Sequence, residues 1–209
     1  PVTASGFNGI FLVATNPVDI MTRITCDLSG FNPRRVLGTG TTLDTARLRY
    51  LLGGYLNADP RNVHAYVIGE HGDSEFVPWS QAMLATKPIL SLCGETGGRN
   101  ICREELDQIA EEVRSAAYRI IEAKNATYYG IGMALTRITK AILGDEHSVL
   151  TVSAMLRGDF GQRDVFVGVP CIINQNGIQK VLPLSLTEEE MKKLEDSCNT
   201  LRTSFEGIF

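Results

Sequence analysis

The N-terminal part of the chain alternates between an apolar run and a helical pattern. The run Gly9–Asn16 (GIFLVATN) is apolar and uncharged, and its lack of polar alternation predicts a strand buried on both faces. Pro17 can open the helix that we expect at Val18–Leu28. A short strand at Val36–Gly38 follows, and a second helix begins near Thr41. This order of strand, helix, strand and helix predicts one parallel βαβ unit.

Helical patterns dominate the middle of the chain. The second helix is expected to continue to Gly53, and Asn62–Gly69 (NVHAYVIG) then predicts a strand. Apolar residues at helical spacing predict an amphipathic helix over Arg103–Lys124. Another helix, Ala126–Leu143, should follow with at most a kink between the two.

Strands return in the C-terminal part. Ser148–Met155 and Val165–Ile173 predict two of them, and the Asn176-Gly177 pair indicates a hairpin turn into a third at Ile178–Leu184. The segment Thr187–Glu190 has the pattern of a capping box that opens a C-terminal helix. The chain should therefore be α/β first and α+β second.

Composition narrows the class of protein. The 209 residues are 44% hydrophobic and 21% charged, which is ordinary for a globular protein. A net charge of −4 and a pI of about 5.4, without Lys/Arg clusters, argue against nucleic acid and membranes as partners. No apolar run has the length of a membrane span, and no export leader is visible. Because the chain starts without Met just before a buried-looking strand, we expect a truncated or cleaved protein.

The cysteines predict neither a disulfide framework nor a zinc site. Their number is odd, and no pair has CxxC spacing. We expect free thiols in a cytoplasmic protein and no bound metal. The five are Cys26, Cys93, Cys102, Cys171 and Cys198.

Two charged residues lie inside an apolar stripe of the second predicted helix. Asp44 and Arg47 are three residues apart and share a helix face. Charges in such a stripe need partners, although a helix cap and an ordinary ion pair would also explain them. His71 lies just past a predicted strand end, where ligands usually bind in α/β proteins, and Gly72 would let a ligand approach. A histidine there suits proton transfer near neutral pH, but a lone histidine is more often structural.

Two further patterns have less weight. The turn Gly38-Thr39-Gly40 joins a strand to a helix like a dinucleotide-binding turn, but Leu43 stands where the third Gly belongs. No acidic residue follows a second strand at the right distance, so we predict only a tight turn. Ser74 near His71 suggests a hydrolase, yet no GxSxG sequence is present.

Four segments, in order, resemble the L-lactate and malate dehydrogenase family, and they are closer to its lactate than to its malate branch. They are ATNPVD (Ala14–Asp19), GTTLDTARLR (Gly40–Arg49), NVHAYVIGEHGDSE (Asn62–Glu75) and NATYYGIGMAL (Asn125–Leu135). The resemblance covers essentially the whole chain. It implies an α/β remnant of a Rossmann domain, residues 1–40, followed by the family's α+β C-terminal domain, residues 41–209.

The resemblance also implies roles for the candidate residues. His71 would donate a proton to the carbonyl oxygen of pyruvate and take it back from L-lactate. Asp44 would orient the imidazole and stabilise its charged form. Arg47 would hold the substrate carboxylate in a two-pronged ion pair. Asn16 would lie beside the substrate and the nicotinamide of NAD, and Thr127 would line the substrate pocket.

Cofactor and effector contacts follow from the same resemblance. Ile131 would pack against the nicotinamide ring. Arg49 and His64 match positions that bind fructose 1,6-bisphosphate across a two-fold axis in bacterial, allosterically regulated members, although a surface Arg and a strand His would also explain them. The family implies a cytoplasmic homotetramer that works in fermentative glycolysis, with fructose 1,6-bisphosphate as activator.

Some parts of the family pattern are absent from this sequence. It contains no GxGxxG, no acidic residue for the adenosine ribose, and no mobile loop with a carbonyl-polarising Arg. We therefore expect the 209-residue chain alone to be inactive or nearly so. Since the missing loop selects the substrate, a malate or hydroxyisocaproate dehydrogenase is an alternative. An alternative of another class is a non-catalytic oligomerisation or anion-binding module.

Overall fold

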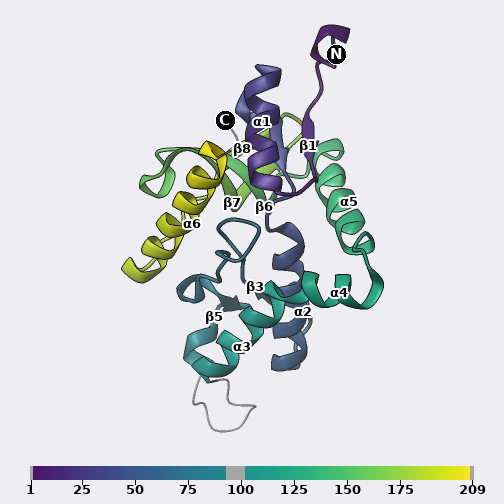
Figure 1. The fold of residues 1–209 in the computed structure, drawn as a ribbon. Coiled ribbons are helices and arrows are strands. Elements are labelled where there is room, and N and C mark those ends of the chain that lie inside the picture. Colours follow the sequence, from purple (N-terminus) through teal and green to yellow (C-terminus); the bar gives the residue numbers. More distant parts are fainter. Residues whose placement is uncertain (1, 93–101, 208–209) are drawn as a thin grey trace.

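The computed structural model describes residues 2–92 and 102–207. In Figure 1, a sheet with three flanking helices lies above a second part built mainly of helices. The helices are α1 (Val18–Ser29), α2 (Thr42–Leu56), α3 (Arg103–Arg114), α4 (Ala116–Lys124), α5 (Tyr129–Leu143) and α6 (Glu188–Glu206). The strands are β1 (Phe11–Val13), β2 (Val36–Gly38), β3 (Val63–His64), β4 (Met83–Leu84), β5 (Lys87–Pro88), β6 (Ser148–Arg157), β7 (Arg163–Asn174) and β8 (Gly177–Val181).

The upper sheet has five strands in the order β1-β2-β6-β7-β8. β1 and β2 are parallel, with Phe11 opposite Val36, and α1 connects them. β2 pairs antiparallel with β6 where Gly38 lies opposite Ser153, and the remaining pairs are also antiparallel. The sheet is thus parallel between β1 and β2 and antiparallel between its other strands. This confirms the predicted fold class of α/β followed by α+β.

Each of the two parts has one main apolar core. The larger lies between the upper sheet and helices α1, α5 and α6, and the smaller lies among α2, α3 and β3. Fully buried side chains include Leu37, Ile138, Val167 and Leu194 in the larger core, and Leu48, Leu52 and Leu106 in the smaller. Helix α2 links the parts, because Thr42 Oγ1 donates to the carbonyl of Thr151 in β6.

The strand predicted over Asn62–Gly69 is much shorter than expected, with only Val63–His64 in β3. Further along, hydroxyls of Thr41, just before α2, and of Thr45, within it, make hydrogen bonds that a neighbouring strand would have made. The backbone N–H of Val67 donates to Thr45 Oγ1 at 2.9 Å, and Thr41 Oγ1 donates to Val67 O at 2.6 Å. Because these hydroxyls satisfy the buried backbone, the extended segment packs against a helix instead of a strand.

Capping residues determine where α2 ends and where α6 begins. α2 runs through Gly53 to Leu56, beyond its predicted end, because Asn57 caps it in the left-handed conformation. The capping box that opens α6 is confirmed: Glu190 N–H donates to Thr187 Oγ1, and Thr187 N–H donates to the Glu190 carboxylate.

The helix predicted over Arg103–Lys124 is two helices. It breaks at Ser115, whose hydroxyl donates to the carbonyl of Glu111 and so competes with the regular helix bonds. Asn125, with φ 58°, ends the second piece, and α5 starts at Tyr129. The kink expected between the helices is therefore a full interruption.

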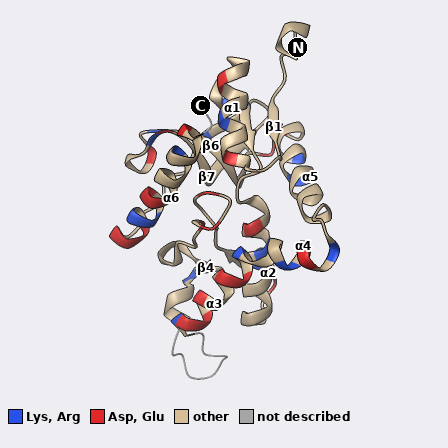
Figure 2. Ribbon diagram, viewed as in Figure 1, with Lys and Arg blue, Asp and Glu red and all other residues tan. Residues whose placement is uncertain are grey.

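Surface charge and cysteines fit the sequence expectations. Acidic and basic residues both occur along α3 and α6 (Figure 2). Among the described residues, no helix combines the length and the apolar character needed to cross a membrane. Free thiols are found at Cys26, Cys102, Cys171 and Cys198, while Cys93 lies outside the described residues.

Candidate active site

The loop Gly69–Glu75 is closed tightly at its base. Ile68 and Phe76 exchange two backbone hydrogen bonds of 2.9 Å, and Gly69 forms a bridge to Gly168 of β7. Gly69 has φ +101°, and a Cβ there would lie 2.8 Å from a buried hydroxyl of α6, so only glycine fits. The loop is thereby fixed to the upper sheet.

His71, near the start of this loop, contacts a carboxylate from α2. Its Nδ1 lies 2.7 Å from Oδ2 of Asp44, whose side chain is 3% exposed. Arg47, one turn further along α2, donates from Nη1 to Oδ1 of the same carboxylate at 3.1 Å. The structure therefore brings the three predicted residues together. Asp44 acts on His71 rather than as part of a helix cap, since Thr41 makes no side-chain cap.

The environment of His71 favours its charged form. Burial disfavours the imidazolium, but the hydrogen bond and the negative charge of Asp44 outweigh burial and raise the pKa of His71 to about 9. The ring is therefore protonated near neutral pH. Its side chain is still 24% exposed. Because Nδ1 faces Asp44, Nε2 is the nitrogen left for a reaction partner.

Asp19 is a functional candidate that the sequence reasoning missed. It lies in the first turn of α1, is 2% exposed, and accepts the backbone N–H of His71 on Oδ2 at 2.9 Å. Burial raises the pKa of Asp19 to about 6, against the lowering effect of hydrogen bonds from Ser153 and His71. The signal was present in the ATNPVD segment, where an acidic residue closely follows an apolar strand.

Helix α6 holds the loop from another side. The fully buried Ser197 accepts the backbone N–H of Glu70 at 2.7 Å, and its Oγ lies 3.0 Å from Oγ of Ser74. Ser74 in turn donates to the Glu70 carboxylate. Ser74 thus belongs to a network that positions the loop, which gives no support to a hydrolase.

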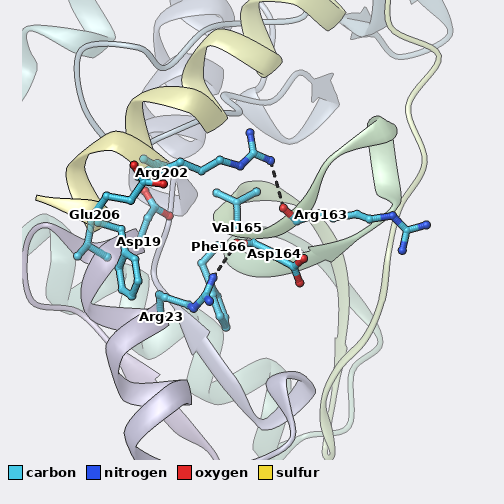
Figure 3. Close-up of a pocket in the computed structure, with 11 residues that line it drawn as sticks. Asp19, Arg23, Arg163, Asp164, Val165, Phe166, Arg202 and Glu206 are labelled. Atoms are coloured by element: carbon cyan, nitrogen blue, oxygen red, sulfur yellow. Dashed lines mark hydrogen bonds between the residues drawn. The ribbon is translucent and has the colours of Figure 1, made fainter. Parts of the chain in front are cut away.

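A cavity of about 430 Å³ is lined by Asp19 together with residues of β7 and α6 (Figure 3). Two arginines connect these elements beside it. Arg23 of α1 donates to the carbonyl of Asp164, and Arg202 of α6 donates to the carbonyl of Arg163. These bonds fix β7 against the two helices that hold the loop.

Asp44, His71 and Glu75 also have the composition of a metal site. One potential ligand atom from each lies within 4.8 Å of the others. Two ligands of one zinc ion, each about 2.0 Å from the metal, would be about 3.3 Å apart. The 2.7 Å between His71 Nδ1 and Asp44 Oδ2 is shorter, and it fits a shared proton better than a metal ion.

Three other predicted residues lie around this cluster. Asn16 is exposed after β1, while Thr127 and Ile131 are half-buried at the N-terminal end of α5. Helix α5 packs on α2 through Gly130, where a Cβ would lie 3.2 Å from Leu43. No hydrogen bond within the described residues joins the three to the cluster, and their roles stay predictions.

The turn at Gly38-Thr39-Gly40 is tight, as predicted. A Cβ at Gly40 would lie 2.4 Å from the backbone nitrogen of Ser153, because the turn packs directly on β6. Thr41, at the start of α2, is fully buried. The N-terminus of α2 therefore has no room for the pyrophosphate of a dinucleotide.

Arg49 and His64 lie close together in the lower part of the molecule. Arg49 Nε donates to the carbonyl of Ala65 at 2.9 Å, and its guanidinium carbon lies 4.8 Å from the centroid of the Tyr66 ring. The two residues that follow His64 thus hold Arg49 in one orientation. His64 itself is exposed on β3. Binding of one ligand by both side chains stays a prediction.

Comparison with known proteins points to one family. The family model described as lactate/malate dehydrogenase, alpha/beta C-terminal domain, matches residues 41–209. The chain is 54% identical over 204 residues to L-lactate dehydrogenase 2 of Bacillus anthracis, and 52% identical over 205 residues to an L-lactate dehydrogenase of Oceanobacillus iheyensis. These matches cover 98% of this chain but only 64% and 63% of the relatives. The chain thus spans less than two thirds of their length.

Solved structures show the same similarity. A minor L-lactate dehydrogenase from Enterococcus mundtii, in its ligands-bound form, matches with a TM-score of 0.95 and 48% identity, over 100% of this chain and 66% of that one. An L-lactate dehydrogenase from Clostridium thermocellum matches with a TM-score of 0.89 and 37% identity, over 99% and 69% of the two chains. The comparisons of sequence and of structure therefore point to the same family.

Proposed function

Because the chain belongs to the lactate/malate dehydrogenase family, we propose that it forms the proton-transfer and substrate-binding part of a bacterial L-lactate dehydrogenase. The reaction is the reversible, NADH-dependent reduction of pyruvate to L-lactate. The observation that carries this proposal is the 2.7 Å contact between His71 Nδ1 and buried Asp44, with Arg47 on the same carboxylate. The names of the relatives favour pyruvate as the substrate.

His71 handles the proton of the reaction. During reduction, the protonated ring donates from Nε2 to the carbonyl oxygen of pyruvate as negative charge develops on that oxygen. Asp44 keeps Nδ1 protonated and stabilises the imidazolium, so a proton is available at neutral pH. In the oxidation of L-lactate, the neutral ring accepts the hydroxyl proton on the same nitrogen.

Arg47 holds the substrate carboxylate. Its bond from Nη1 to Asp44 is the only hydrogen bond it makes within the described part of the chain. Its other N–H groups are left to bind a carboxylate with two parallel hydrogen bonds. The Arg47 side chain is 18% exposed, and partial removal from water strengthens such an ion pair. Thr127, half-buried before α5, would line the substrate pocket.

NAD supplies or accepts the hydride when bound. The described residues fit its nicotinamide end, since Asn16 offers an exposed amide and Ile131 a half-buried apolar side chain. The buried turn at Gly40 offers no place for the pyrophosphate. We therefore assign residues 1–40 to the end of a cofactor-binding domain and residues 41–209 to the substrate-binding domain. The chain alone should be inactive or nearly so.

Fructose 1,6-bisphosphate is the proposed activator. Arg49 and His64 would face one phosphate, and the same pair from a second copy would face the other, in a cytoplasmic homotetramer. The fixed orientation of Arg49 over Tyr66 supports a preformed anion site. Calorimetric titration of the chain with the bisphosphate tests this assignment. Unchanged binding after substitution of both Arg49 and His64 would refute it.

The activity is tested in a hybrid of this chain with the part of the Bacillus anthracis relative that it lacks. We expect NADH-dependent reduction of pyruvate by the hybrid. Asp44→Asn should lower kcat about 100-fold or more and move the pH profile to lower pH, because the proton donor loses its stabilising charge. The exposed Asp196 of α6 provides the control, Asp196→Asn. A hybrid that folds and binds NADH but does not reduce pyruvate would exclude the proposed role of His71.

Substrate choice needs a separate measurement, because a hybrid carries the substrate loop of the relative. The full-length source protein should be compared on pyruvate, oxaloacetate and 2-oxoisocaproate. We expect the highest kcat/KM with pyruvate. A higher value with either other acid would replace L-lactate dehydrogenase by the corresponding 2-hydroxy-acid dehydrogenase.

A further inference from the structure

A second carboxylate lies beside the Asp44–His71 pair. We propose that Glu75 is a positioning residue for proton transfer, a second anionic partner of the His71 ring that sets how strongly the ring holds its proton. This inference rests on the proposed function of His71 as the proton donor. It adds to that function a residue that tunes the donor and that ionises separately from Asp44.

Glu75 is held in place by the closure of the loop. It directly precedes Phe76, which is paired to Ile68 at the loop base. Its backbone N–H donates to the carbonyl of Gly72 at 3.2 Å, and its own carbonyl accepts from Arg114 Nη2 of α3 at 3.2 Å. The backbone of Glu75 is therefore bonded on both sides, and its side chain has a fixed starting point.

The side chain of Glu75 faces the catalytic ring. Glu75 Oε2 lies 3.9 Å from His71 Nδ1, compared with 2.7 Å for Asp44 Oδ2. The Glu75 side chain is only 5% exposed. At this depth water screens the interaction weakly, so a charge on Glu75 acts strongly on the ring. The ring thus has one carboxylate at hydrogen-bond distance and another just beyond it.

The charged groups around Glu75 have opposite effects on its pKa. Asp44 and Arg47 face it from α2, His71 from its own loop and Arg114 from α3. Burial, followed by the negative charge of Asp44, raises the pKa of Glu75 to about 8, against the three positive groups. Near neutral pH the cluster therefore carries a proton on both the imidazole and Glu75. On the α1 side, Asp19 also favours the charged ring.

Ionisation of Glu75 would change the chemistry of His71. A charged Glu75 makes the imidazolium a weaker proton donor for ketone reduction, and it makes the neutral ring a stronger base for oxidation of the hydroxy acid. The two groups titrate as a coupled pair. The effect is confined to the mildly alkaline range, because below it Glu75 is neutral.

The three histidines of the chain, His64, His71 and His147, make the test direct. In the 209-residue chain with ¹⁵N-labelled imidazoles, Glu75→Gln should lower the NMR titration midpoint of His71 by about one pH unit, a tenfold loss of proton affinity. The matched control is Asp73→Asn, which removes an exposed charge from the same loop. This control should leave the titration midpoint of His71 unchanged. Unchanged signals of the other two histidines would confirm that each variant is folded.

Infrared difference spectra of the unsubstituted chain give an independent measurement if Glu75→Gln fails to fold. A protonated carboxyl band should disappear between about pH 7 and pH 9. An unchanged His71 midpoint in a folded Glu75→Gln chain, or the lack of that band, would overturn the inference. Neither experiment uses NAD or substrate. A failure of the proposed dehydrogenase activity would therefore leave these results unaffected, and the reverse also holds.

Discussion

Asp19→Asn offers a quantitative test of how the buried cluster responds to pH. A carboxyl with an ordinary pKa of 3.8 in the unfolded chain and about 6 in the folded protein binds its proton more tightly when folded. It contributes stability below pH 3.8, and that contribution is lost as the pH rises through 6. Since one pKa unit corresponds to about 1.4 kcal/mol, the full loss is about 3 kcal/mol. Asp19 is 2% exposed, so solvent screening reduces this value little.

The substitution removes the ionisation and keeps the shape of the side chain. The amide oxygen can still accept the backbone N–H of His71, so the loop should stay in position. Any packing difference shifts the unfolding free energy equally at every pH. The free energy of unfolding of Asp19→Asn minus that of the wild type should therefore rise by about 2 to 3 kcal/mol between about pH 4 and pH 7.5.

Urea unfolding at a series of pH values measures this difference directly. Asp196→Asn, which alters an exposed carboxylate of α6, is the control and should give a nearly flat difference. If the Asp19→Asn difference is also flat, the carboxyl of Asp19 does not titrate abnormally in the fold. A difference that falls with pH would mean that the charged form is the stabilised one, contrary to the burial argument.

Two more substitutions test how the loop and the segment before it are held. Thr45→Val keeps the side-chain shape but removes the acceptor for the Val67 N–H, so the unfolding free energy should fall by about 1 to 3 kcal/mol. A loss below about 0.5 kcal/mol in urea unfolding would show that the segment does not depend on this bond. Ser197→Ala leaves the Glu70 N–H without its acceptor and should speed hydrogen exchange of the loop amides. Ser204→Ala, on an exposed face of α6, should leave exchange unchanged, and equal rates in both variants would argue against the α6 contact.

The sequence predicts local features well and long-range contacts poorly. The helix that carries Asp44 and Arg47, and their common face, follow from spacing alone. Their meeting with His71 depends on how the extended segment crosses α2, which local patterns do not encode. The residues of that segment suit a strand, so its sequence predicts one. The hydroxyls of Thr41 and Thr45 replaced the neighbouring strand, and a hydrophobic pattern does not distinguish a threonine on the surface from one that binds backbone.

The sequence also could not predict all the residues of the candidate site. Asp19 and Glu75 both lie inside segments that resemble the family, yet each acidic residue alone looks like an ordinary solvated side chain. Their burial is decided by helix α1 and by loop closure between Ile68 and Phe76, which are tertiary events. The family resemblance supplied His71, but the environment that shifts its pKa became visible only with the fold.

The elements that hold His71 come from distant parts of the chain. Asp19 of α1 binds its backbone, Asp44 of α2 binds its ring, and Ser197 of α6 binds the residue before it. All of these contacts join described residues of the chain to one another. The environment of the proposed proton donor is therefore built by residues of this chain, whereas the proposed hydride transfer would also require NAD, for most of which this chain offers no binding residues. An isolated chain should then show a His71 titration well above that of an ordinary histidine while turning over no pyruvate. A normal titration of His71 in the chain would mean that the contacts with Asp44 and Asp19 do not suffice to build the proton donor.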